Sequence, residues 1–80
     1  MKLNEVLNSL IELRFIHENL NIMVVLNNGK DDNAVNKLFE CYLPVPQAMH
    51  FFGEFEVIRN QIKNINNQPV FWFMLAYKEL

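Results

Sequence analysis

The sequence predicts a single α+β domain over residues 1–80, with a three-stranded, mainly antiparallel sheet and two helices in the order helix, strand, strand, helix, strand. Two long segments carry apolar residues at the three- and four-residue steps of a helix. Three shorter segments are typical of strands: two are apolar runs bounded by polar residues or proline, and the third alternates in part between its two sides. The hydrophobic fraction of 51 % indicates that the chain folds around one small core.

The first half of the chain contains one predicted helix and two predicted strands. Residues 3–19 repeat leucine, valine and isoleucine on one stripe, so they are expected to form an amphipathic helix. The run 22–26 is the first strand, and the polar stretch 27–33 is expected to form an exposed turn. Residues 37–43 are then the second strand, antiparallel to the first.

Prolines mark the start of the second predicted helix. Pro44 and Pro46 cannot donate to a sheet, and Pro46 suits the first turn of a helix. Apolar residues keep helical spacing over roughly 46–66, which predicts a long helix there. Within this segment, Gly53 indicates either a close approach of another backbone or a slack position. The last strand is predicted at 70–77.

Two features of the assembly stay open at the level of sequence. The last strand can lie beside the first strand, in an all-antiparallel order 2-1-3, or beside the second strand through a right-handed crossover. The helices can cover one face of the sheet together, or each can cover its own face. If both helices cover the same face, the other face of the sheet is apolar and has no helix on it.

The last strand carries the strongest indication of function, because both of its alternating sets of side chains are apolar. If both helices cover one set, the other set forms an apolar surface of the size that marks interaction sites. Trp and Met are enriched at the centres of interfaces. We therefore predict a protein-binding surface made of Trp72, Met74, Tyr42 and Val70.

Composition limits the other classes of function. The net charge is −2, and the seven basic residues are scattered, so we do not expect a nucleic-acid partner. The single cysteine excludes an intramolecular disulfide framework and favours a reducing compartment. Glu5 interrupts the segment where an export signal would be apolar, and no apolar run approaches the length of a membrane span. We expect a cytoplasmic chain with no membrane association.

These observations predict a small protein-binding protein that acts stoichiometrically, for instance a phage-encoded inhibitor of a host factor, an antitoxin or an immunity-type protein. Its partner would be another protein or a second copy in a homodimer. The alternative is a homo-oligomer that encloses a small ligand such as a nucleotide signal, with His50, Arg59 and Tyr77 as the polar groups. We predict no enzyme, cofactor or metal site, because Cys41 and His50 lack the surroundings of a catalytic pair.

Overall fold

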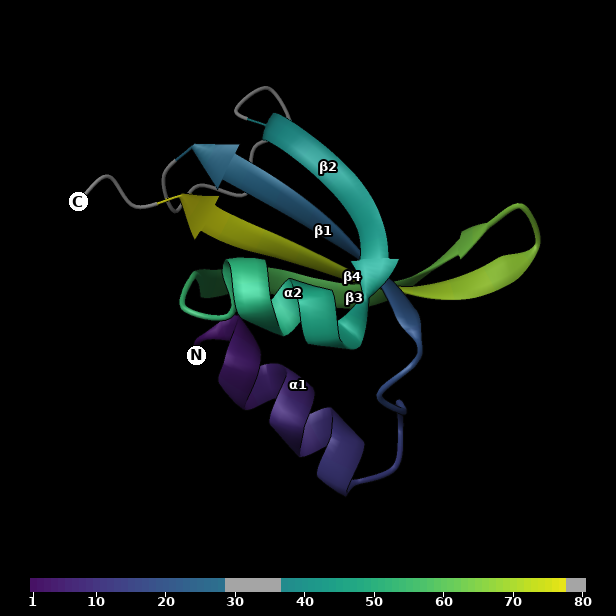
Figure 1. Cartoon of the computed structure of the whole chain (residues 1–80). Coiled ribbons are helices and arrows are strands. Elements are labelled where there is room, and N and C mark those ends of the chain that lie inside the picture. Colours follow the sequence, from purple (N-terminus) through teal and green to yellow (C-terminus); the bar gives the residue numbers. More distant parts are fainter. Residues whose placement is uncertain (29–36, 78–80) are drawn as a thin grey trace.

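The computed structural model describes residues 1–28 and 37–77 (Figure 1). These residues form the helices α1 (Leu3–Glu12) and α2 (Val45–Phe52) and the strands β1 (Asn21–Asn28), β2 (Lys37–Pro44), β3 (Glu56–Ile65) and β4 (Gln68–Tyr77). The strands make one mixed sheet in the order β2-β1-β4-β3. The α+β class is confirmed, whereas the predicted three-stranded, mainly antiparallel sheet is wrong.

The extra strand β3 occupies most of the segment predicted as a long helix. The helix α2 starts near Pro46 as expected, but it ends at Phe52. Beyond it, Val57 and the isoleucines of β3 are β-branched residues, which favour strands because their χ1 angles are restricted. Their helical spacing is a coincidence, since most of the outer part of β3 is exposed.

A two-residue turn joins β3 to β4. Asn66 and Asn67 both have left-handed backbone, with φ of 53° and 65°, and Ile65 pairs with Gln68 across the turn. Asparagine tolerates this conformation better than most residues, and two consecutive left-handed residues are typical of tight hairpins. The hairpin extends past the other strands in Figure 1.

The reversal at this turn also sets the direction of the last strand. β4 lies beside β1, as one of the two predicted arrangements has it, but runs parallel to β1, so the all-antiparallel order is wrong. The β1–β4 ladder begins at Met23 and Trp72, and Pro69 precedes it in the extended part of the hairpin. Proline is tolerated there because β1 requires no amide donor from it.

The pairing of β1 with β2 confirms the predicted first two strands. The ladder is antiparallel and runs from the pair Asn21 and Pro44 to the pair Asn27 and Lys37. The predicted turn over 27–33 begins with the last two residues of β1, and the rest of that turn lies outside the described residues.

The first helix is shorter than predicted because a Schellman motif ends it. The amide of Phe15 donates to the carbonyl of Leu10, and the amide of Arg14 donates to the carbonyl of Ile11, both at 3.0 Å. Arg14 takes the left-handed position of this motif, with φ of 62°. Glycine is the usual residue at that position, so the sequence gives no signal for the end of the helix.

Both helices pack on the same face of the sheet (Figure 1). One buried cluster joins the two helices to β1 and β4; its members are Leu3, Leu7, Ile16, Ile22, Val24, Leu26, Val45, Ala48, Phe73 and Leu75. The opposite face carries a separate small cluster of Val25, Trp72 and Met74. We call that opposite side the helix-free face.

The start of α1 is joined to the segment that follows α2. The amide of Asn4 donates to the carbonyl of Gly53, and the amide of Leu3 donates to the carbonyl of Phe55, both at 3.0 Å. A Cβ atom at position 53 would meet the side-chain amide of Asn4 and the carbonyl of Met49. Of the two interpretations of Gly53, the close approach is therefore confirmed.

Candidate functional site

Five aromatic rings form a continuous row on the helix side of the molecule. Ring centroids lie 6.4 Å apart for Phe51 and Phe52, 6.2 Å for Phe52 and Phe55, and 6.1 Å for Phe55 and Tyr77. Phe39 of β2 joins the row from the side, at 5.8 Å from Phe52. These tilted and edge-on arrangements are the ones that aromatic pairs prefer. We call these five residues the aromatic row.

Local backbone structure brings the rings of the row together. The helix α2 ends with Phe51 and Phe52, and the amide of Phe55 donates to the carbonyl of Phe52 at 3.1 Å in a tight turn. Phe39 lies opposite Leu26 in the ladder, which places its side chain on the helix side. Tyr77 is the last residue of β4. Three segments that are distant in sequence therefore supply one surface.

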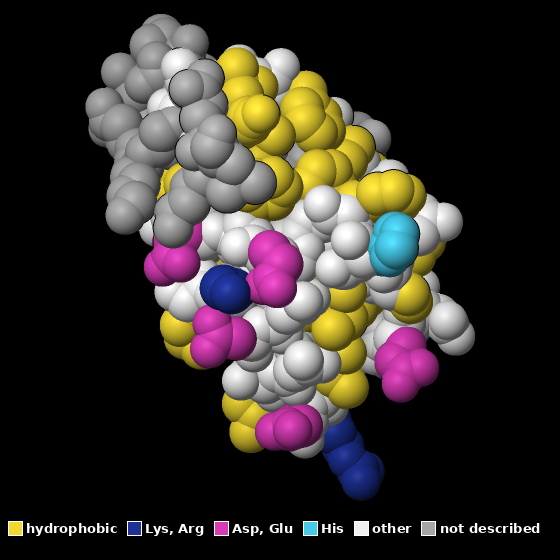
Figure 2. Space-filling model, turned by 60° about the vertical axis from the view of Figure 1, so that its left-hand side comes forward, with side chains coloured by type: hydrophobic (Ala, Val, Ile, Leu, Met, Phe, Trp, Pro, Cys, Tyr) yellow, Lys and Arg dark blue, Asp and Glu magenta, His cyan; other side chains and the backbone are white. Residues whose placement is uncertain are grey.

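The aromatic row is substantially exposed. Phe51 is 63 % exposed, Phe39 41 % and Tyr77 39 %. With about 200 Å² for a whole aromatic side chain, these three residues present roughly 300 Å² of apolar surface. That is the size of the largest patch on typical monomers, which is often functional. Figure 2 shows apolar side chains gathered in the upper part of this view, above a band of acidic and basic side chains.

The structure places the predicted site residues of β4 on the helix-free face but covers them. Trp72 is only 7 % exposed, Met74 5 % and Val70 8 %. The ammonium group of Lys63 lies 4.0 Å from the centre of the Trp72 ring, in a cation–π contact. Lys63 of the edge strand β3 thus covers part of the Trp72 ring, Met23 and Ile58 pack against the same cluster, and little of Trp72 is open to a partner.

Tyr42 differs from the other three predicted residues, because it is 54 % exposed. It lies opposite Met23 in the ladder and therefore on the helix-free face, near Trp72. A groove of about 320 Å³ runs between this side chain and the turn end of the β3–β4 hairpin; its lining residues are Met23, Tyr42, Ile65, Asn66, Gln68 and Val70. Tyr42 and Val70 are thus brought together in one groove.

The three residues predicted for a small ligand do not converge within one chain. His50 packs edge-on against Phe51 at 4.9 Å, and Tyr77 lies at the other end of the aromatic row. Arg59 lies opposite Met74 on the helix-free face and donates to the side chain of Gln61 at 3.4 Å. A ligand site that uses all three residues stays a prediction.

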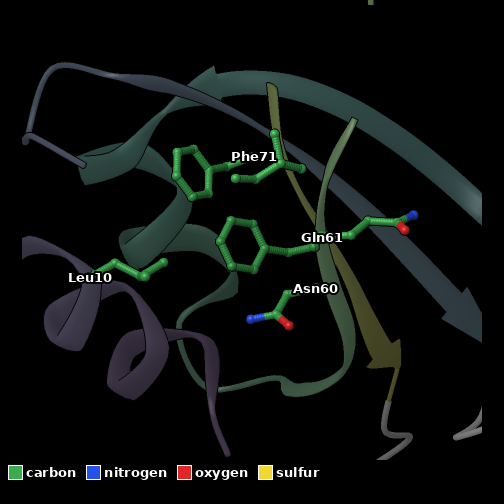
Figure 3. Close-up of a pocket in the computed structure, with 6 residues that line it drawn as sticks. Leu10, Asn60, Gln61 and Phe71 are labelled. Atoms are coloured by element: carbon green, nitrogen blue, oxygen red, sulfur yellow. The ribbon is translucent and has the colours of Figure 1, made fainter. Parts of the chain in front are cut away.

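A small cavity opens between α1 and the β3–β4 hairpin (Figure 3). Its volume is about 170 Å³, and its lining residues are Leu10, Asn60, Gln61, Ile62, Phe71 and Phe73. In Figure 3 the side chains of Leu10 and Phe71 approach this space, whereas the side chain of Gln61 points away from it. The cavity is mainly apolar, with Asn60 and Gln61 as its polar lining residues.

Cys41 packs against the helix-side core as a partly buried residue. Burial raises the pKa of its thiol, because the charged thiolate is poorly solvated there. The thiolate is the reactive form of cysteine. Cys41 is therefore held in its unreactive form near neutral pH.

The burial of Cys41 predicts that its thiol reacts slowly with thiol reagents and that the free energy of unfolding depends on pH. At pH 7.5, Cys41 is expected to react with a thiol reagent several-fold more slowly than cysteine in a short peptide, and at the peptide rate in denaturant. Because the pKa is raised in the folded state, the thiol is expected to lower the free energy of unfolding once the pH exceeds about 8.5. Cys41→Ala should remove that decline. Equal rates in the folded chain and the peptide would contradict the burial.

Neither the remaining geometry nor similarity to known proteins assigns a function. Within residues 1–28 and 37–77, no group of three or more His, Cys, Asp or Glu side chains is placed to hold a metal ion. In the same part of the chain, no helix has the length and apolar character needed to cross a membrane. No protein-family model, curated protein or solved structure matches the chain.

The sequence prediction missed the aromatic row, although a signal for it exists. Three phenylalanines occur among residues 51–55, on both sides of Gly53. Assigned to one long helix, they look like core residues on a stripe. Once the helix ends at Phe52, the chain turns, and Phe51 projects outward while Phe52 and Phe55 pack side by side.

Proposed function

We propose that this chain is a protein-binding protein that acts stoichiometrically, and that the aromatic row is the surface that meets its partner. The observation that carries the proposal is Phe51, a largely exposed ring that lies against the partly buried ring of Phe52. Exposed aromatic side chains on a rigid support lose little conformational freedom on binding. Aromatic residues are also enriched at the centres of interfaces.

The area of the aromatic row indicates how much further contact surface a partner must supply. Burying roughly 300 Å² at about 25 cal/mol per Å² contributes on the order of 7 kcal/mol. Association costs about 4 to 15 kcal/mol in lost translational and rotational freedom. The row is large enough to be the centre of an interface but too small to be all of it. We expect the partner to extend over His50, whose exposed ring adds polar nitrogen atoms beside Phe51.

A one-to-one complex of this kind fits an inhibitor, an antitoxin or an immunity-type protein. Such proteins work by occupying a surface of their target, so they require an apolar patch on a small stable scaffold. The sheet face predicted from β4 offers a different protein little apolar surface, because Trp72 and Met74 are buried in the single chain and the exposed side chains at its edges are polar. The proposal therefore rests on the aromatic row and not on the last strand.

Site-specific photo-crosslinking tests the proposal. A benzophenone-bearing phenylalanine replaces Phe51 in one variant and Phe15 in a matched control, because Phe15 is equally exposed, at 65 %, but lies outside the row. After irradiation in the native cell, position 51 should give one dominant adduct to a defined protein. Position 15 should not give that adduct. The same adducts at both positions, or none at position 51, would contradict the proposal.

A further inference from the structure

The helix-free face has a charge pattern that is complementary to itself. Strand register places Glu40, Val25, Met74 and Arg59 side by side in one row across β2, β1, β4 and β3. From β2 to β3, this row is acidic, apolar, apolar and basic. Glu40 and Arg59 are both exposed at the two edges.

The neighbouring row repeats the pattern in a weaker form. It contains Tyr42, Met23, Trp72 and Gln61, in the same strand order. Its centre is apolar, and its edges carry a phenol and an amide, which can hydrogen-bond to each other. Lys63 follows Gln61 on the same edge and reaches over Trp72.

We propose that a second copy of this chain docks on the helix-free face, sheet against sheet, about a two-fold axis parallel to the strands. Rotation about this axis reverses the order of the strands in the second copy but does not shift residues along the strands. Each row therefore meets the same row of the second copy, read in the opposite direction. Glu40 of one copy then faces Arg59 of the other, and Val25 faces Met74. Two-fold contacts of this kind are the commonest in homo-oligomers, and sheets pack in nearly aligned pairs.

The area of the face is of the order that a dimer needs. Four strands at about 4.8 Å spacing, with about 3.3 Å per residue over eight residues, cover roughly 500 Å² in projection. Stable interfaces bury about 800 Å² on each partner. We therefore expect a reversible dimer of moderate affinity.

Two polar contacts at the edges of the face are easily displaced. Lys63 contacts Trp72 through an exposed ammonium group. Glu40 pairs with Lys37 at 3.4 Å, but both side chains are about half exposed, and such surface pairs contribute little. Docking can therefore move Lys63 aside, which opens the Trp72 ring to the second copy, and can exchange Lys37 for Arg59 of the second copy as the partner of Glu40.

Charge exchange between two variants tests this dimer. Sedimentation equilibrium should show a monomer–dimer equilibrium for the wild-type chain. Glu40→Arg and Arg59→Glu should each raise the dimer dissociation constant at least tenfold, because each places like charges opposite each other. An equimolar mixture of the two variants should recover nearly wild-type affinity, since every facing pair is then opposite in charge.

Further measurements distinguish this dimer from misfolding of a variant and from association through the aromatic row. Circular dichroism checks that each variant folds, and Tyr42→Asp serves as a second disruptive variant if Arg59→Glu does not fold. Trp72, the single tryptophan, should change its emission as the dimer forms. Phe51→Ser should leave the dimer intact, because Phe51 lies in the aromatic row. A wild-type chain that stays monomeric, or variants that do not recover on mixing, would overturn the proposal, whatever the crosslinking at Phe51 shows.

Discussion

Phe73→Ala is expected to lower the free energy of unfolding by about 3 to 5 kcal/mol, the cost of removing a large buried ring and leaving a cavity. Phe73 is 1 % exposed and lies on β4, between β1 and β3, where both helices cover it. A domain of this length has a total stability of about 4 to 12 kcal/mol. The variant should therefore be partly or wholly unfolded at 37 °C.

Urea unfolding followed by circular dichroism measures this loss. Phe51→Ala is the matched control, because it removes the same ring from an exposed position, and it should change the unfolding free energy by less than about 1 kcal/mol. If the two variants lost equal stability, Phe73 would not lie at the centre of the core.

Gly53→Ala is expected to destabilise the chain by about 1 to 3 kcal/mol through overpacking. The backbone at Gly53, with φ of −60° and ψ of −28°, suits any residue, so the cost is steric and not conformational. The added methyl group would push against Asn4, whose amide is hydrogen-bonded to the carbonyl of Gly53. Moving Asn4 also moves Leu3, a fully buried core residue.

A double-mutant cycle separates this steric effect from a general loss of helix packing. Asn4→Ala combined with Gly53→Ala should recover part of the lost stability, because it removes one of the two groups that the methyl would meet. Glu54→Ala, at the exposed neighbouring position, should cost less than about 1 kcal/mol. Strictly additive losses for the first pair would contradict the close contact between Asn4 and Gly53.

The elements with one dominant local signal were predictable from sequence. The strand β1 follows from a short apolar run with polar borders, β2 from partial alternation of its side chains, and the start of α2 from Pro46. The strand that follows Gly53 was not predictable from sequence, because its isoleucines fit both the helical and the strand pattern. The Asn66-Asn67 pair is the feature that decides it: as a two-residue turn it requires strands on both sides.

Two further errors follow from features that single-sequence patterns do not encode. The left-handed conformation of Arg14 ends α1 early, although arginine is a good helix former. The direction of β4 depends on how many strands precede it, so the missed strand β3 also reversed the expected pairing with β1. One local misassignment therefore changed the topology of the whole sheet.

The candidate site was predictable only in part, for a related physical reason. Alternation along β4 puts Trp72 and Met74 on one side of the strand, and the enrichment of Trp and Met at interfaces favoured that side as the face without helices, where the structure places both residues. Alternation does not show that neighbouring strands supply Lys63, which lies over Trp72, and Met23 and Ile58, which pack against the same cluster. The aromatic row depends on three segments that meet only after folding, so no single stretch of sequence displays it.

The most direct test of the proposed function is the affinity of the complex with the protein that crosslinks to position 51. Isothermal titration should give one partner per chain and, for Phe51→Ser, a dissociation constant at least tenfold higher than for the wild-type chain, as expected for a central aromatic contact. Phe15→Ser, which removes an equally exposed ring elsewhere, should change the constant by less than about threefold. Equal affinities for the two variants would contradict the role of the aromatic row.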